Sequence, residues 1–419
     1  MELLGLLLAL VVIILVTSKW HEVIYALLLG IAIIIVFSSM SISSVISTFM
    51  AATLNYGTIS LTIIVLLITL FSSVMYKTLL LDKLLKSLID LLKNIHILIA
   101  AIPALVGLLA VPGGAIMSAP FVDQLGNRIN MPNDYKAAVN TFYRHILLFF
   151  NPLAPMLIVA ADLSTLGFLP IMKFHLIPVI ITLIIGHLVL KYLCPYPTHK
   201  AEVSNNQKDE VENEDVSHSF STSLKNLFVS GLPLITAIIL ALVFEVNFIL
   251  ALVIAIVLTI IIDYQGDKVL KASDIKPLFS KGINWKLGLS VYTIMLFGEF
   301  IKDSGSISIM AQVITNSNMS LLLIVLISSI VVGFASGHPI VGAAILYPIF
   351  LPLIGDSAAY LSLIFTGMML GYTSSPVHLC LIVSNEYFKT SYFGINKLLL
   401  PLQALLTALV VVMTILVYS

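Results

Sequence analysis

Charge is the property that this sequence has least of. Only 10% of its 419 residues are Asp, Glu, Lys or Arg, and the formal net charge is zero. A soluble globular domain carries about a quarter charged residues, so these charges cannot cover the surface of a water-soluble protein of this length. The balanced charge gives no indication of a nucleic-acid partner, and we expect none.

Cysteine is almost absent as well. The two cysteines, Cys194 and Cys380, are far apart, which excludes a disulfide framework and a metal site built on closely spaced cysteines. A signal peptide is not indicated either, because the apolar block at residues 3–16 has no basic segment before it and no small-residue cleavage site after it. We predict that this block is the first membrane span.

The sequence is rich in long apolar blocks, and 59% of its residues are hydrophobic. Crossing a bilayer takes about 20 apolar residues in a helix, and only helices satisfy their own backbone hydrogen bonds within one segment in lipid. We therefore predict an all-α membrane protein. Full spans are expected near residues 2–18, 22–38, 58–77, 137–162, 171–191, 231–244, 248–262, 287–301, 358–385 and 398–417.

Two further apolar stretches, at residues 97–124 and 321–353, are interrupted in the middle. The first interruption reads Val-Pro-Gly-Gly at 111–114, and the second reads Ser-Gly-His-Pro at 336–339. Proline and glycine end a helix at such positions, and each remaining arm is about 20 Å long, too short to cross a bilayer. We predict two re-entrant hairpins, each entering and leaving on one side of the membrane: the one at 97–124 on the cytoplasmic side and the one at 321–353 on the outside.

Lysine and arginine indicate the orientation. With both termini outside, every Lys and Arg except Lys173 and Lys302 falls on the cytoplasmic side, if Arg144 lies in the cytoplasmic half of its span. This distribution follows the positive-inside rule, and it would be lost if either hairpin crossed the membrane once. We expect a multi-pass protein of the plasma membrane with an N-terminal half at 1–197, a polar cytoplasmic linker at 198–229 and a C-terminal half at 230–419.

The two halves share an order of breaks, prolines and spacings. Asn151-Pro152 and Ser375-Pro376 are each followed five residues later by Leu-Ile-Val, at a constant offset of 224. Each half holds five full spans and one hairpin, and because five is odd, the second half must begin on the opposite face. The predicted fold is two inverted five-span repeats, each with one re-entrant hairpin and one broken span, an architecture of secondary carriers.

Four short helices are expected to begin near the middle of the membrane, at the two hairpin tips and in the two broken spans. Their free N–H groups and positive dipole ends favour an anion, and the unwound carbonyls before each break suit Na⁺. We expect Asn151 and Ser375 to be N-caps, each followed by a proline at the first helical position. The candidate substrate- or ion-binding residues are Pro112, Gly113, Gly114, Arg144, His145, Asn151, Pro152, Gly337, His338, Pro339, Thr373, Ser374, Ser375 and His378.

Arg144 and the histidines each have two interpretations. Arg144 lies about 10 Å below the Asn151 break by helical rise, and it either binds a substrate carboxylate or anchors its span at the cytoplasmic interface. His338 and His378 either relay a proton or satisfy helix ends. Together with His145 they are not expected to bind a metal ion, because no carboxylate or thiolate is placed to join them.

This pattern of spans, hairpins and breaks resembles the ion transporter superfamily, which includes divalent-anion/sodium symporters, gluconate permeases and arsenite carriers. Tyr-Arg-His-Ile at 143–146, Ser-Pro-Val-His-Leu-Cys at 375–380 and Glu-Tyr-Phe at 386–388 resemble an uncharacterised integral membrane family within it. The resemblance implies an elevator mechanism in a homodimer, with hairpins and broken spans as the moving part. The symporters' Ser-Asn-Thr tip motifs correspond to residues 112–114 and 337–339, and this sequence lacks the motif at both tips.

The function expected from these features is secondary active transport of a small organic anion, such as a carboxylate, coupled to H⁺ or Na⁺. We do not expect an enzyme, because no Asp or Glu is placed to complete a catalytic set with a serine and His378. A channel, an ion/H⁺ antiporter and an intramembrane enzyme remain alternatives. The channel needs a continuous polar pore, the antiporter a titrating carboxylate in the core, and the enzyme a nucleophile, a base and an orienting group in one half. We expect no cofactor beyond the coupling ion, and the expected partners are the anion, the lipid bilayer and a second copy of the chain.

Overall fold

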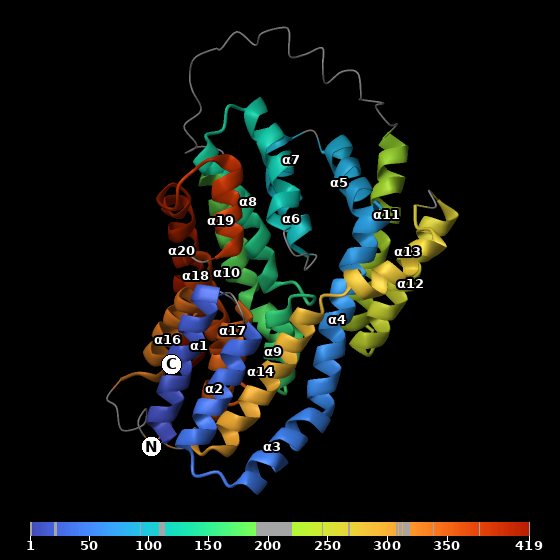
Figure 1. The fold of residues 1–419 in the computed structure, drawn as a ribbon. Coiled ribbons are helices and arrows are strands. Elements are labelled where there is room, and N and C mark those ends of the chain that lie inside the picture. The colour runs from blue at the N-terminus through green and yellow to red at the C-terminus, as the bar shows by residue number, and fades with distance from the viewer. Residues whose placement is uncertain are drawn as a thin grey trace.

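The protein is all-helical in every described part of the chain (Figure 1). The computed structural model describes residues 2–20, 23–92, 94–108, 114–189, 220–244, 246–266, 269–306, 309, 312, 319–337, 339–376 and 378–418. Most of the linker predicted at 198–229, together with Pro112, Gly113 and His338 of the hairpin tips, lies outside these residues. The helices of the first half are α1 (Glu2–Trp20), α2 (Val23–Phe37), α3 (Ile42–Leu54), α4 (Tyr56–Lys77), α5 (Leu80–Leu91), α6 (Ile95–Leu108), α7 (Gly114–Arg128), α8 (Asn133–Ile146), η1 (Leu147–Phe149), α9 (Pro155–Leu163) and α10 (Phe168–Leu188).

The second half is also helical in its described residues. Its elements are α11 (Phe220–Leu242), α12 (Phe248–Gln265), α13 (Ala272–Pro277), the π-helix η4 (Leu278–Gly282), α14 (Trp285–Asp303), α16 (Leu321–Ser336), α17 (Pro339–Ile354), α18 (Ala358–Thr373), α19 (Leu379–Phe388) and α20 (Tyr392–Tyr418). Helix α11 begins inside the segment predicted as linker, so the end of that segment is helical.

The described helices suit a multi-pass membrane protein. Five of them, α4, α10, α11, α12 and α20, are long and apolar enough to cross a bilayer. Eight shorter apolar helices accompany them, including both arms predicted for the second hairpin. Three α-helices were not predicted. Helices α3 and α13 have only 13 and 6 residues, and the charges on one face of α5 hide the apolar stripe that packs against α11. An amphipathic stripe of this kind gives a weak hydropathy signal.

Both broken spans are broken where the sequence predicts, but the second helix of each starts later than predicted. Helix α9 starts at Pro155 and α19 at Leu379, in each case three residues beyond the proline expected at the first helical position. The N-cap positions are Ala154 and His378, so the prediction that Asn151 and Ser375 are N-caps is wrong. The reason at the first break is a turn, in which the Leu153 N–H donates to Asn151 Oδ1 over 3.0 Å.

Two close helix crossings occupy equivalent places in the two halves. Helix α6 crosses α8 where a Cβ on Gly107 would lie 2.5 Å from the carbonyl oxygen of Arg144. Helix α16 crosses α18 where a Cβ on Gly333 would lie 2.2 Å from the carbonyl oxygen of Met368. Arg144 and Met368 are separated by the repeat offset of 224. Only glycine permits such an approach, and small residues have this use at helix contacts in membranes.

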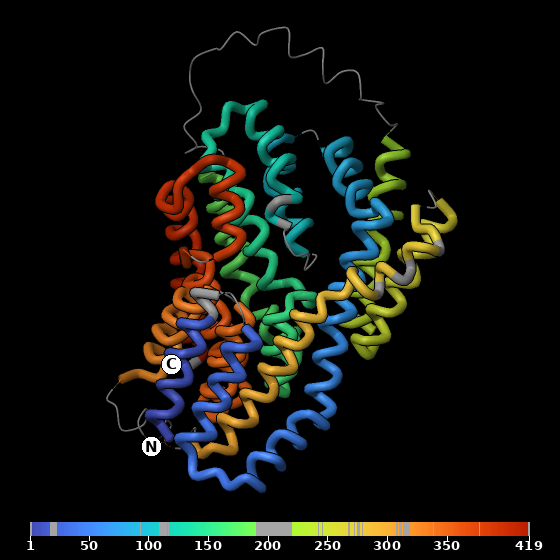
Figure 2. Tube along the Cα trace, in the orientation of Figure 1, coloured from blue at the N-terminus to red at the C-terminus, as the bar shows by residue number. Residues whose placement is uncertain are grey.

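The helices form two groups. Helices α6 to α10 pack with α16 to α20, and α1 to α5 pack with α11 to α14. The groups meet mainly where α14 contacts α17, α1 contacts α16 and α4 contacts α9. Figure 2 shows α14 running obliquely across the molecule, and it packs on both α2 and α4. In Figure 1 the α6–α7 pair lies in the upper half of the molecule and the α16–α17 pair in the lower half.

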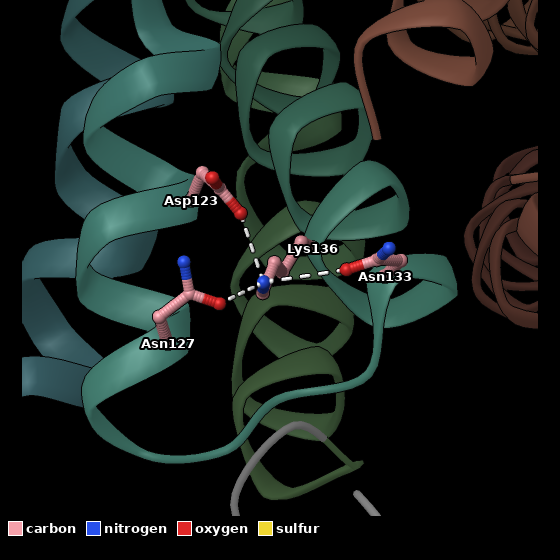
Figure 3. Close-up of polar contacts among 4 residues, drawn as sticks. All are labelled: Asp123, Asn127, Asn133 and Lys136. Atoms are coloured by element: carbon pink, nitrogen blue, oxygen red, sulfur yellow. Dashed lines mark hydrogen bonds and ion pairs between the residues drawn. The ribbon is translucent and has the colours of Figure 1, made fainter. Parts of the chain in front are cut away.

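A buried ammonium group ties α7 to α8 (Figure 3). The Lys136 side chain is 4% exposed, and its Nζ donates to Asp123 Oδ1 at 2.8 Å, to Asn127 Oδ1 at 2.5 Å and to Asn133 Oδ1 at 3.3 Å. A buried charge needs such partners, because an unpaired ion in an apolar interior costs several kcal/mol. The cluster therefore holds the second helix of the α6–α7 pair against the first helix of the broken span.

We expect Asp123→Ala to destabilise the protein by about 1–3 kcal/mol, because the buried Lys136 charge loses its carboxylate. The loss stays below that of a fully buried pair, since the Asp123 side chain is 38% exposed. Thermal unfolding in detergent measures the effect. The matched control is Glu299→Ala, whose partner Lys302 is 68% exposed at 3.6 Å and which should change stability by less than about 0.5 kcal/mol. Adding Lys136→Met to Asp123→Ala should recover most of the loss; no recovery would contradict this account.

Candidate functional site

Helices begin or end at the predicted hairpin tips in the described residues. Gly114 is the first residue of α7, and Pro339 is the first residue of α17. Gly337 ends α16 in the left-handed conformation with φ of 57°, and its N–H donates to the Gly333 carbonyl at 3.2 Å. Glycine adopts this positive φ with little strain, whereas a residue with a side chain would be strained. The apolar stretch at 321–353 is therefore two helices with a sharp end between them, as predicted.

Asn151 connects the first broken span to the first pair of short helices. Its side chain is buried, and Nδ2 donates to the carbonyl oxygen of Leu108, the last residue of α6, over 2.8 Å. The last carbonyls of a helix have no partner within the helix, so this bond satisfies a group that lipid would leave unpaired. Pro152 is buried beside it. Asn151 thus caps the C-terminus of α6 instead of the N-terminus of α9.

The hydroxyl groups at the second break are engaged within α18. Thr373 Oγ1 donates to the Met369 carbonyl at 2.7 Å, and Ser374 Oγ donates to the Leu370 carbonyl at 2.5 Å. Each hydroxyl donates its proton within α18 and keeps its oxygen lone pairs, so the contribution of these oxygens to a ligand site stays a prediction. The carbonyl of Ser374 accepts from the Tyr392 hydroxyl at 2.5 Å, so the break is also tied to α20.

The structure brings together two of the predicted residues, His145 and His378, from opposite halves of the chain. Their ring centroids are 4.9 Å apart with the planes at 84°, and both side chains are buried. Tyr372 completes the group, with its ring centroid 4.0 Å from that of His378 and 5.6 Å from that of His145. The last turn of α8 therefore meets the second break, where α18 ends and α19 begins.

Cys380 joins the two histidines. One ligand atom from each of the three side chains lies within 4.8 Å of the other two, and the Tyr372 hydroxyl is within hydrogen-bonding reach of the thiol. The expectation that no thiolate is placed to join the histidines is therefore wrong. The signal was present as His-x-Cys at 378–380, but only the fold shows that His145 lies next to it.

The imidazole of His145 is oriented by its own helix. Its Nδ1 lies 2.6 Å from the carbonyl oxygen of Thr141. A carbonyl only accepts hydrogen bonds, so Nδ1 carries the proton and a neutral ring presents Nε2 as a lone pair. The Arg144 guanidinium, which is half-buried, acts electrostatically on this ring and on Tyr372. The group as a whole offers nitrogen and sulfur donors beside one positive charge.

A buried polar network supports this group from the side of α7, and sequence reasoning missed it. Asn140 on α8 is fully buried and donates through Nδ2 to the Ala115 carbonyl at 3.1 Å and to Ser384 Oγ at 3.3 Å. Ser118 Oγ donates to Asn140 Oδ1 at 2.6 Å. The network joins α7, α8 and α19. An asparagine in an apolar span was a usable signal, since intramembrane polar residues usually find partners.

We expect Asn140→Leu to lower the free energy of unfolding by at least about 2 kcal/mol, because it removes the buried hydrogen bonds of Asn140 to Ala115, Ser118 and Ser384. Thermal unfolding in detergent should show a fall of several degrees. Asn385→Leu on α19 is the matched control: Asn385 Oδ1 has no hydrogen-bond partner in the part of the chain that the structure describes. Equal losses in the two variants would show that Asn140 is not the centre of a network.

Comparison with known proteins places the chain in a family. No curated protein matches it significantly. One protein family does match, over residues 3–418, and it is described as "Protein of unknown function (DUF401)". The match includes α1 to α20, both broken spans and the His145–His378–Cys380 group. The chain therefore belongs to the DUF401 family.

Proposed function

We propose that the protein is a secondary active transporter that moves a small organic anion, such as a carboxylate, through the plasma membrane by an elevator mechanism. The observation that carries the proposal is a reciprocal packing of short helices. Helix α7 contacts α19, and α17 contacts α9, so one arm of each predicted hairpin packs on the broken span of the other half. This exchange is what a two-fold relation between inverted repeats produces.

Inverted repeats supply a physical reason for transport. If the halves are equivalent but oppositely oriented, each can adopt the conformation of the other, which gives two states of similar energy facing opposite sides. The equivalent crossings at Gly107 and Gly333 support that equivalence. The division into two helix groups, joined by α14–α17, α1–α16 and α4–α9, supports a moving body and a scaffold. In this proposal α6 to α10 and α16 to α20 move, and α1 to α5 with α11 to α14 form the scaffold of a homodimer.

The chemistry around the breaks supports an anion as substrate. The N-cap residues of α9 and α19, Ala154 and His378, make no side-chain cap hydrogen bond, so the first N–H groups and positive dipole ends of these helices are suited to a carboxylate. Arg144 lies on α8 just before the first break and supplies a full positive charge. Coupling to H⁺ would use His145 or His378, and coupling to Na⁺ would use the unwound carbonyls at the breaks.

The test of the substrate class is a thermal-shift screen of purified protein against small carboxylates, with and without Na⁺ and at two pH values. A ligand that binds only the folded state stabilises it by about 2.7 kcal/mol at 100 times its Kd, which is a rise of a few degrees in Tm. We expect one or more carboxylates to raise Tm and Arg144→Gln to abolish the rise. Arg128→Gln, at the end of α7, is the control and should retain it. If neutral solutes raise Tm and carboxylates do not, the anion assignment is wrong.

A disulfide between the two helix groups tests the elevator movement. A Cβ at Gly298 on α14 would lie 3.8 Å from the Cβ of Pro348 on α17, which matches the Cβ separation of disulfides. We expect Gly298→Cys with Pro348→Cys, in a Cys194→Ser background, to lose uptake into proteoliposomes when oxidised and to regain it when reduced. The substrate is the carboxylate with the largest thermal shift. Each single-cysteine variant serves as control, and full uptake by the cross-linked protein would refute movement at this interface.

A further inference from the structure

We infer that His145, His378 and Cys380 form a binding site for a transition-metal ion of borderline softness, such as Zn²⁺. The three residues come from α8, from the second break and from α19, and the fold brings His145 next to the local His-x-Cys pair at 378–380. One ligand atom from each lies within 4.8 Å of the other two. Both histidines are buried, and the thiol is partly buried. The site stands on this geometry alone and does not depend on the proposed transport.

The spacing of the ligand atoms is close to what a metal ion imposes. Tetrahedral Zn²⁺ has bonds of about 2.0–2.3 Å to nitrogen and sulfur, which sets its ligand atoms about 3.3–3.8 Å apart. The observed limit of 4.8 Å exceeds this by about 1 Å. Rotation about the side-chain bonds of Cys380 and His378 covers a difference of this size, because both residues lie at the start of a helix next to a break. The backbone of α8 need not move.

The orientation of His145 is the orientation of a metal ligand. Its Nδ1–H donates to the carbonyl oxygen of Thr141 at 2.6 Å, which directs the lone pair of Nε2 away from the helix backbone. Histidines that bind metal usually donate their other N–H to a carbonyl or carboxylate in this way, which sets the tautomer and raises the basicity of the ligand atom. Thr141 is in turn held by its own hydrogen bonds, from Oγ1 to the Ala137 carbonyl and to Ser384.

The donor set selects the class of metal. Two imidazoles and one thiolate suit Zn²⁺, Co²⁺ or copper, whereas Mg²⁺ and Ca²⁺ require oxygen ligands. Three protein ligands leave the fourth tetrahedral position open, as in sites that bind water or a substrate. Binding releases the Cys380 proton to solvent, and the thiolate forms the metal–sulfur bond. The positive charge of Arg144 repels a cation but stabilises the thiolate. A divalent ion bound to one thiolate carries one net positive charge, which is the charge that the guanidinium then faces.

The test is a titration of the purified, chelator-treated protein with Co²⁺ in detergent, followed by displacement with Zn²⁺. We expect one Co²⁺ per chain, intense visible bands typical of tetrahedral cobalt, and a near-ultraviolet absorption that arises only from a thiolate–cobalt bond. Cys380→Ser should lose the near-ultraviolet absorption. Cys194→Ser, which removes the other cysteine of the chain, is the matched control and should keep it. His378→Ala should weaken binding at least tenfold.

The wild-type measurement can overturn the inference without any variant. A folded protein, judged by its elution volume and Tm, that shows no thiolate–cobalt absorption would refute the site. An absorption that persists in Cys380→Ser would assign the bound cobalt to other residues and would refute it equally. None of these outcomes depends on uptake, so loss of the metal site and failure of the transport proposal are distinguishable.

Discussion

The structure depends on one constraint: backbone groups freed by a break in a membrane helix must find partners inside the protein. Helices α6, α16 and α18 end within the described core, and each solves this differently. Asn151 donates to the last carbonyl of α6. The left-handed Gly337 allows its N–H to bond back to α16. At the end of α18, Thr373 and Ser374 bond to carbonyls of their own helix and Tyr392 bonds to the carbonyl of Ser374. Two of these ends also join separate helices, since Asn151 bonds to α6 and Tyr392 of α20 bonds to Ser374.

Buried polar side chains extend these joints into a connected body. The Lys136 ammonium group ties α7 to α8, and Asn140 ties both to α19. The helices that Lys136 and Asn140 join are short, so each buries little apolar surface of its own. Close helix crossings at Gly107 (α6–α8) and Gly333 (α16–α18) add van der Waals packing to these hydrogen bonds. The helices of the breaks thus form a unit with its own internal bonds, and its contacts with the other group of helices run through α14, α1 and α4.

The chemistry of the centre is not symmetric, although the helices around it correspond. The positions that match Arg144 and His145 in the other half are Met368 and Met369, and both methionines are buried. The second break instead contributes His378 and Cys380, which meet His145 across the boundary between the halves. The N-terminal half therefore supplies a cation and one imidazole, and the C-terminal half supplies a thiol and a second imidazole. A site assembled in this way needs both halves in a single relative position.

The sequence by itself determined the membrane character, the positions of most helices and the location of the two broken spans, because apolar block length and Pro-Gly interruptions are local properties of the chain. It did not determine that α9 starts three residues beyond the predicted proline, because the side chain of Asn151 is held by a partner on α6. The sequence also did not predict the amphipathic helix α5, whose apolar face is buried against α11. Only the tertiary structure decided that Cys380 lies beside His145, since residues 235 positions apart meet through the packing of α8 on α19. Contacts of that range depend on the complementarity of many side chains at once, and no pattern within one segment encodes them.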